Sequence, residues 1–178
     1  MVTWVLVVVL AIAVAVLVVF VAGYNKLRTA DVRADEALGG IDVELTRRAS
    51  LIPALVHTVT TFAAHEQAVL ERVSAARAAL DTATGGTSVA ARSAAEAQLD
   101  SAVGQVLALG QSYPQLSSSA NFLDLQRTLT DTENTLAFAR QYYNDAAATV
   151  NRLIGTIPWM YVAGRAGVSQ REYYQTPR

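Results

Sequence analysis

The sequence predicts an all-α protein, with an N-terminal transmembrane helix followed by an antiparallel bundle of long helices. Residues Val2 to Gly23 are uncharged and almost entirely apolar. Beyond them, apolar residues recur at alternating steps of three and four, which is typical of packed helices. Strand signals are scarce, since no Asn-Gly or Asp-Gly hairpin turn occurs. We expect an anchor at residues 1–23, a four-helix bundle at residues 24–158 and an aromatic, basic tail at residues 159–178.

The first segment has the length of a membrane span. At about 1.5 Å per helical residue it reaches about 30 Å, the thickness of a hydrocarbon core. A cleaved signal peptide is the alternative interpretation. However, the chain starts MVTW without a positive region, and the apolar run exceeds the roughly 7–15 residues usual in signal peptides. The segment is therefore predicted to remain as an anchor.

Charge asymmetry predicts the orientation of this span. No Lys or Arg precedes it, whereas Lys26, Arg28 and Arg33 follow it closely. The positive-inside rule then predicts a single-pass protein of the inner (cytoplasmic) membrane, with its N-terminus outside and its bundle in the cytoplasm. Trp4 and Tyr24 stand near the two ends, where aromatic rings favour the headgroup layer.

Composition excludes several classes of function. The 14 Lys and Arg residues nearly balance the 15 Asp and Glu residues, which argues against a basic surface for nucleic acid. The chain has no cysteine, so it has no disulfide, thiolate metal site or cysteine nucleophile. We expect no cofactor.

The first helix of the bundle is predicted to continue from the anchor. Gly39-Gly40 interrupts it, and a bend is expected there. From Ile41 to Leu80 the apolar stripe keeps its phase, with Arg48 and Glu66 occupying two positions on it.

Pro53 lies inside this stripe. Proline removes a helical hydrogen bond, so a kink or a helix boundary is expected just before it. The unbroken phase on both sides favours continuity instead. From the residues alone, the stretch 41–80 is either one long helix or two helices joined by a turn near residues 63–66.

Clearer boundaries follow. Residues 84–88 form a turn in which Thr87 or Ser88 caps the next helix, and that helix ends near Tyr113-Pro114. A last helix is predicted to end at Gly155 and Pro158. Its stripe keeps the steps of three and four over five heptads, through Phe122, Leu125, Leu129, Thr132, Leu136, Ala139, Tyr143, Ala146, Val150, Leu153 and Ile157.

Two long runs resemble the LemA family of bacterial membrane proteins. They are IDVELTRRASLIPALVHTVTTFAAHEQAVLERVSAARAA and ANFLDLQRTLTDTENTLAFARQYYNDAAATVNRLIGTIP. The resemblance implies a single N-terminal span with a four-helix bundle, which favours a turn near residues 64–66. It also implies a role in membrane organisation, including magnetosome membranes, and a link to a membrane metalloprotease.

No pattern indicates an active site. His57 and His65 are eight residues apart, about 12 Å along a helix, which is too far to share one metal ion. A turn near Ala64 would bring them closer, but a site would still need more ligands. No acidic residue is paired in sequence with a nucleophile or a phosphate-binding loop. We expect no catalytic, cofactor or metal site, and no enzyme.

Arg48 is the most informative charge. A buried guanidinium without a partner costs several kcal/mol, so it is expected to meet a carboxylate. Glu133 is the predicted partner, with Asp131 or Asp145 as alternatives. The other interpretation is that Arg48 and Glu66 face a neighbouring subunit.

The tail has two interpretations. In one, Trp159 and Tyr161 cap the bundle core and the following residues are disordered. In the other, an even number of antiparallel helices returns the tail to the membrane, where these aromatic rings lie at the interface. The tail also contains Arg165, Arg171, Tyr173, Tyr174 and Arg178.

The features together predict a non-enzymatic, membrane-anchored helical protein that self-assembles and organises or shapes the membrane. Its partners are then the lipid bilayer and further copies of itself, with no nucleic acid. The alternative is an adaptor or regulator of another envelope protein, such as a membrane metalloprotease. In that case the apolar stripes are purely internal.

Overall fold

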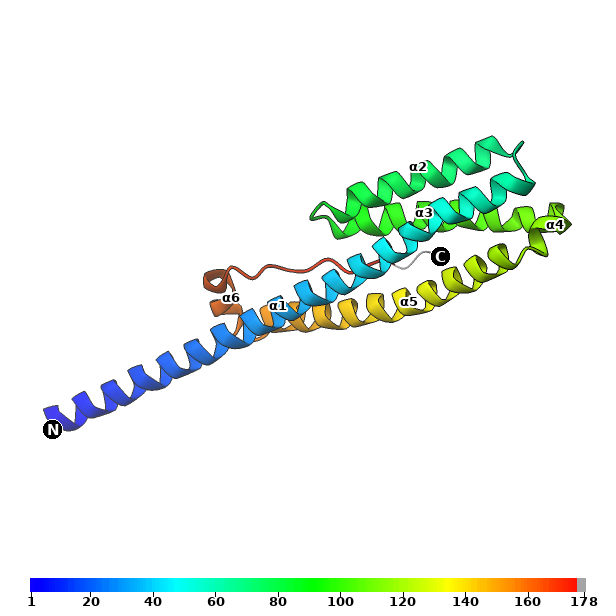
Figure 1. The fold of residues 1–178 in the computed structure, drawn as a ribbon. Coiled ribbons are helices and arrows are strands. Elements are labelled where there is room, and N and C mark those ends of the chain that lie inside the picture. Colours follow the sequence, from blue (N-terminus) through cyan, green and yellow to red (C-terminus); the bar gives the residue numbers. More distant parts are fainter. Residues whose placement is uncertain (176–178) are drawn as a thin grey trace. The chain divides into compact units, whose positions relative to one another are not determined.

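The computed structural model describes residues 1–175, and every regular element in that range is a helix (Figure 1). In chain order the helices are α1 (Val2–Phe62), α2 (Gln67–Thr84), α3 (Val89–Ser112), α4 (Pro114–Ser117), α5 (Ala120–Ile154) and α6 (Met160–Ala166). The prediction of an all-α chain is confirmed.

The chain forms two compact units. The first contains Met1–Ala37 and Asn144–Arg171, and the second contains Leu38–Tyr143 and the chain from Glu172 onward. Helices α1 and α5 contribute residues to both. Residues 159–171 belong to the first unit, and the residues that follow belong to the second.

Helix α1 begins with the apolar segment. This is the one helix within residues 1–175 that is long and apolar enough to cross a membrane, and none of its apolar window is buried. The helix continues without a break through Gly39-Gly40 and Pro53. Ile52 and Leu55, on either side of the proline, are both fully buried. Their packing explains why the helix does not end at Pro53, although one backbone hydrogen bond is lost there.

The turn after Phe62 decides the question of one helix or two. The amide of Ala63 still donates to the carbonyl of Val59 at 2.8 Å, and the amide of Glu66 then donates to the carbonyl of Ala63 at 3.1 Å. Helix α2 begins at the next residue, Gln67. The turn expected from the family resemblance is therefore present, and the single long helix is excluded.

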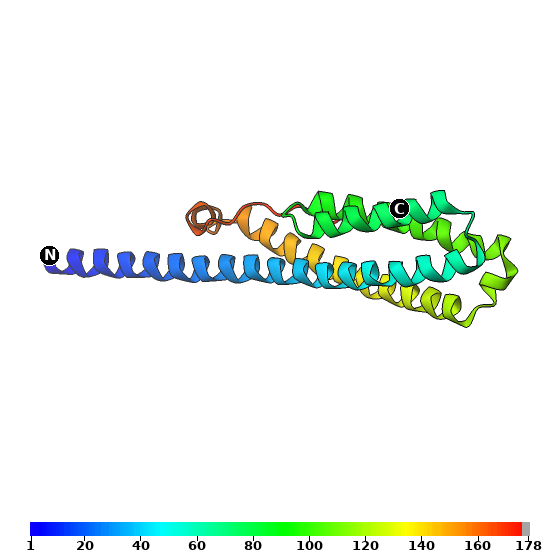
Figure 2. The same ribbon diagram turned by 45° about the horizontal axis from the view of Figure 1, so that its top comes forward.

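Helices α2 and α3 lie side by side in both ribbon views (Figure 1 and Figure 2). The turn between them ends at Ser88, whose hydroxyl accepts from the amide of Ala91 at 3.1 Å. This is the cap expected from the sequence, because the first amides of a helix have no partner inside it. Helix α3 ends at Ser112, and Pro114 then opens the short α4.

The predicted stripe of α5 is buried along most of the helix. Its fully or nearly buried members are Phe122, Leu129, Thr132, Leu136, Tyr143, Val150 and Leu153. Ile157 is an exception, since its side chain is 72% exposed. The helix ends at Ile154, so the three-and-four phase no longer determines where Ile157 points.

The first unit has its own core, formed by α1, α5 and α6. Leu27, Ala30 and Ala34 of α1 pack with Val150 and Leu153 of α5. From α6 and the residue pair after it come Val162, Ala163, Ala166 and Val168. Helix α6 ends at Ala166 and is capped by Gly167, whose φ of 67° is the left-handed conformation that glycine adopts without strain.

The chain after α6 is extended but well packed. Val168 and Tyr174 are buried, and the ring of Tyr174 meets that of Tyr143 edge to face at 6.4 Å. The Tyr143 hydroxyl donates to the carbonyl of Glu172 at 2.8 Å. A disordered tail is therefore wrong for residues 167–175. Arg178 lies outside the described residues.

Candidate membrane interface and buried ion-pair network

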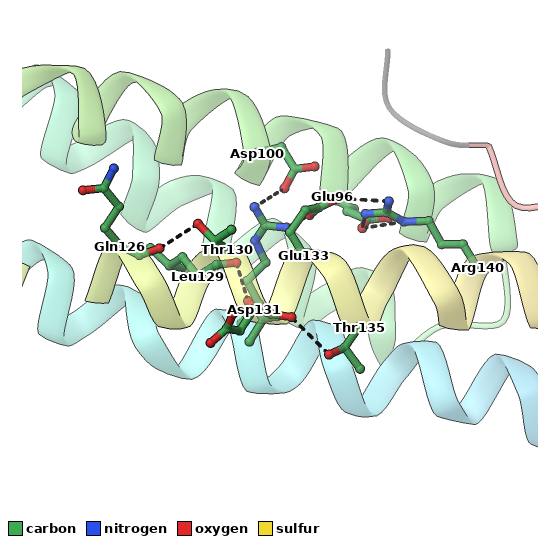
Figure 3. A network of polar contacts seen from close by, with 11 residues as sticks. Glu96, Asp100, Gln126, Leu129, Thr130, Asp131, Glu133, Thr135 and Arg140 are labelled. Atoms are coloured by element: carbon green, nitrogen blue, oxygen red, sulfur yellow. Dashed lines mark hydrogen bonds and ion pairs between the residues drawn. The ribbon is translucent and has the colours of Figure 1, made fainter. Parts of the chain in front are cut away.

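A network of buried and half-buried charges lies inside the second unit. It consists of Arg48 on α1, Glu96 and Asp100 on α3, and Glu133 and Arg140 on α5. Figure 3 shows Glu96 meeting Arg140 of α5, and a separate dashed line marks the ion pair of Asp100 in the same network. The network therefore links three helices that are distant in the sequence.

Arg48 has two carboxylate partners. Its Nη1 donates to Glu133, the partner predicted from the sequence, and its Nη2 lies 2.9 Å from Oδ1 of Asp100. Asp100 was not foreseen. The alternatives Asp131 and Asp145 are exposed and are not partners of Arg48. Arg48, which lies on the apolar stripe of α1, is thus neutralised by carboxylates from two other helices, α3 and α5.

Arg140 forms the most deeply buried pair of the network. Its Nε donates to Oε1 of Glu96 at 3.0 Å, and its Nη2 contacts the same oxygen. The side chains are 3% and 0% exposed, respectively. Arg140 Nη1 also donates to Glu133 at 3.1 Å, so Glu133 bridges the two arginines.

Burial and charge shift several pKa values in this network. Burial raises the pKa of Asp100 to about 6, and the nearby Arg48 charge opposes that rise. Burial disfavours the charged form of Arg140, but the hydrogen bonds and charges of Glu96 and Glu133 together outweigh this effect and raise its pKa. Burial also raises the pKa of Tyr174, and the charge and hydrogen bond of Glu96 add to the rise.

The three carboxylates lie close enough to suggest a cation site. One oxygen each from Glu96, Asp100 and Glu133 lies within 4.8 Å of the others. Each of these groups is already paired with Arg48, Arg140 or both. A metal ion would have to compete with two guanidinium groups, so the arrangement favours a structural ion-pair network over a metal centre.

Sequence reasoning missed Glu96 and Arg92, although a signal for both was present. On α3 the residues Val89, Arg92, Glu96, Leu99, Val103 and Val106 follow the same steps of three and four, and all six are buried. Arg92 donates to both carboxylate oxygens of Asp42, at 2.7 and 3.2 Å, and to the carbonyl of Gly86 at 2.8 Å. A charged residue on the apolar stripe of α3, like Arg48 on the stripe of α1, therefore indicates a buried ion pair.

Glu66, the other charge on the first stripe, also has a partner within the chain. It lies in the turn before α2 and accepts a hydrogen bond from the Tyr113 hydroxyl at 2.9 Å. This bond raises the pKa of Tyr113. His57 and His65 are both exposed.

The residues predicted to lie at the membrane belong to the first unit. Trp4 and Tyr24 are exposed on α1, twenty residues apart, which corresponds to about 30 Å of helix. Lys26 Nζ lies 5.5 Å from the centre of the Trp159 ring, a cation–π geometry. Tyr161 is 70% exposed.

Trp159 packs against Gly23, the last residue of the apolar segment. A Cβ at Gly23 would lie 2.5 Å from the Trp159 ring, so only glycine leaves room for it. Trp159 is half-buried against the core of the first unit. Arg28, the remaining predicted interface residue, is exposed and pairs with Asp31 at 3.5 Å.

Residues 37–178, most of the chain, match the LemA family. The chain belongs to the LemA family. The region matched includes the ion-pair network of the second unit together with α5 and α6. The apolar segment lies before it.

Curated relatives of this LemA-family chain include two magnetosome proteins. Magnetosome protein MamQ 2 of Paramagnetospirillum magneticum is 32% identical over 81 residues, which is 46% of this chain and 30% of the relative. Magnetosome protein MamQ of Magnetospirillum gryphiswaldense is 31% identical over 80 residues, 45% of this chain and 29% of the relative. The match thus spans under a third of the length of these relatives. With the apolar helix, they indicate a membrane-associated protein.

A further ion-pair cluster in the first unit of this LemA-family chain holds the segment after α6. Arg171 Nη2 lies 2.5 Å from Oδ1 of Asp31, and Nη1 lies 2.6 Å from Asp35. Asn151 donates to the Arg171 carbonyl and accepts from the Arg171 amide, at 2.9 and 2.8 Å. The hydrogen bond to Asp35 outweighs burial and raises the pKa of Arg171.

The shifted pKa of Asp100 predicts a pH dependence of stability. Its pKa is about 6 in the folded protein against a usual 3.8, so the folded state binds more protons between these values. Stability therefore falls as pH rises through this window, by about 3 kcal/mol from this group. Asp100→Asn should flatten the profile when thermal unfolding is followed at pH 4 to 8. Asp124→Asn, which changes an exposed aspartate of the same unit, is the control; equal profiles for the two variants would contradict the assignment.

A pair of glycine substitutions tests the contact between Gly23 and Trp159. Gly23→Ala should displace the Trp159 ring and lower the melting temperature, because its Cβ has no room. Gly39→Ala should raise stability by about 0.5–1 kcal/mol, since nothing lies within 4 Å of that Cβ and alanine is the better helix former. Circular dichroism of the full chain in detergent measures both. Equal effects of the two changes would show that Trp159 does not need the glycine.

Proposed function

We propose that this LemA-family protein is a non-enzymatic membrane anchor protein that self-assembles and organises or shapes the membrane. The observation that carries the proposal is the apolar start of α1. Its mean hydropathy is 3.5 over an 18-residue window, and no part of that window is buried by the rest of the described chain. Side chains of this kind are stable when lipid surrounds them.

The proposed placement is a single span in the inner membrane, with the N-terminus outside and the helical units in the cytoplasm. Lys26, Arg28 and Arg33 directly follow the span and support this orientation. Helix α1 continues from the span to Phe62 without a break. No loop therefore separates the anchor from the α1 residues that pack in the two units.

We further propose that the second unit is an antiparallel four-helix bundle of α1, α2, α3 and α5. The ion-pair network joins α1, α3 and α5, and α2 pairs with α3. The turns after Phe62 and Thr84 are short, as expected for antiparallel neighbours. Such a unit presents polar helix faces to water while its stripes stay internal.

Self-assembly is supported by an exposed apolar pair on α5. Phe138 and Tyr142 are 74% and 62% exposed and are four residues apart, so they lie on the same helix face. The matching relatives are magnetosome proteins, and the family resemblance implies membrane organisation. Many anchored copies that contact one another through this face would impose order on the surrounding lipid.

Gentle extraction tests the proposal. The full chain is released from membranes with a mild detergent, and the mass of the particle is measured together with its protein content. A large, homogeneous particle containing only this chain is expected. A small particle with a different protein bound would overturn self-assembly and favour an adaptor. Recovery of the intact chain from the soluble fraction without detergent would overturn the anchor itself.

Matched variants locate the contact between copies. Phe138→Ser combined with Tyr142→Ser should reduce the particle to a smaller one, because the exposed apolar pair is removed. Val43→Ser, which changes an exposed apolar residue on α1, should leave the particle size unchanged. If both variants give the parent size, the pair on α5 is not the contact.

A further inference from the structure

We propose that the turn before α6 and the outer face of α6, residues 157–165, form a second membrane contact that lies in the headgroup layer and binds anionic lipid. The inference rests on the proposed anchor. It adds to it a lipid-binding surface that holds the first unit at a fixed depth and rotation relative to the bilayer.

Helix α6 lies beside the end of the apolar span. Trp159 packs onto Gly23, the residue at which the apolar segment ends, and Lys26 lies over the same ring. The inner face of α6, made of Val162, Ala163 and Ala166, is buried in the core of the first unit beside Leu27 of α1. Because the span ends at this level of α1, α6 lies where the lipid headgroups begin.

The outer face of α6 and of the turn before it is largely apolar. Ile157, Met160 and Tyr161 are exposed, although all three are large and apolar. Within α6 the step from 161 to 165 places Tyr161 and Arg165 on one side of the helix. An apolar and aromatic face that ends in arginine is typical of segments that lie in a membrane interface.

The residues around the end of the span are basic. Around the end of the span, residues 23–28 and 152–165 contain the basic residues Lys26, Arg28, Arg152 and Arg165 and no acidic residue. Asp31, slightly farther along α1, is paired with Arg171 and Arg28, and Asp35 is paired with Arg171. The surface near the span is therefore positive and fits anionic headgroups, each basic side chain contributing about 1 kcal/mol near such a surface.

These observations favour lipid over a second copy of the chain as the occupant. The exposed face is continuous with the apolar span through the contact of Trp159 with Gly23. A span alone leaves the protein free to rotate about the helix axis and to shift in depth. A second contact beside it removes both freedoms, which a protein that organises lipid needs.

The chain has no cysteine, so a single nitroxide label can be placed at will. Full-length Tyr161→Cys and the control Val43→Cys, which is similarly exposed on the second unit, are labelled and reconstituted into bilayers. Collision with lipid-soluble oxygen and with a water-soluble nickel complex is then measured. The label at 161 should favour oxygen, and the label at 43 should favour nickel.

Three outcomes would overturn the inference. A label at 161 that meets nickel as readily as the label at 43 places α6 in water. A label shielded from both probes shows that protein covers the face. Vesicle flotation separates the second contact from the anchor. If the chain floats while its 161 label is aqueous, only the second contact is refuted. If the chain does not float, the anchor itself is refuted.

The lipid specificity is tested in the same system. Burial of the 161 label should increase at least threefold, as the ratio of oxygen to nickel collisions, when phosphatidylglycerol is added to a zwitterionic bilayer. Arg152→Gln combined with Arg165→Gln should abolish this increase. The same increase in a zwitterionic bilayer with inorganic phosphate would show a free-anion site and overturn the assignment to lipid.

Discussion

Arg140→Met is expected to lower the free energy of unfolding by about 3–5 kcal/mol, because it leaves the carboxylate of Glu96 buried without its charge partner. The Glu96 side chain is 0% exposed, so water cannot replace the guanidinium. The substitution keeps most of the side-chain volume, which separates the loss of charge from the loss of packing. In a domain of this size the melting temperature should fall by more than about 10 °C.

Thermal unfolding of the full chain in detergent, followed by circular dichroism, measures this effect. Arg77→Met is the control, since the Arg77–Asp81 pair is exposed and its atoms are 3.8 Å apart; a change within about 0.5 kcal/mol is expected there. Glu96→Met combined with Arg140→Met should be more stable than Arg140→Met alone, because no charge is then left buried. Arg140→Met with the stability of the control would refute the buried pair.

Arg48→Ala is expected to cost about 2–3 kcal/mol, somewhat less than the loss of Arg140. Its partners Asp100 and Glu133 are partly exposed, so water compensates them in part. Without Arg48 the pKa of Asp100 should rise further, since the arginine is the main group that opposes the effect of burial. The destabilisation should therefore be larger at pH 8, where the carboxylate must ionise, than at pH 5, where it holds a proton.

The exposed neighbour Arg47 supplies the control for this variant. Arg47→Ala removes a positive charge from the same turn of α1, and its only described ion pair is the 4.0 Å contact with Glu44. Its melting temperature should stay near that of the parent at both pH values. If Arg48 instead served a contact between copies, its loss would act only at high protein concentration, and the variant would match the parent on dilution.

Periodicity alone was enough to predict the long helices and the buried face of α5, but it left open whether residues 41–80 form one helix or two. The apolar segment, the stripe of α5 and the need of Arg48 for a carboxylate all follow from the order of residues, because a helix has a known period and an unpaired buried charge has a known cost. The choice of Glu133 also came from its position beside that stripe. The same period on α3 contained the signal for Glu96 and Arg92.

What the tertiary structure decided is which residues of different helices face one another. A helical period shows which side is buried but not the register against a neighbouring helix, so Asp100 and the Glu96–Arg140 pair became visible only with α1, α3 and α5 in place. Likewise, an extended segment has no period, and the packing of Arg171 and Tyr174 was hidden for that reason. The residue order thus determined an apolar N-terminal helix and the buried sides of other helices, while long-range contacts determined the partner of each buried charge.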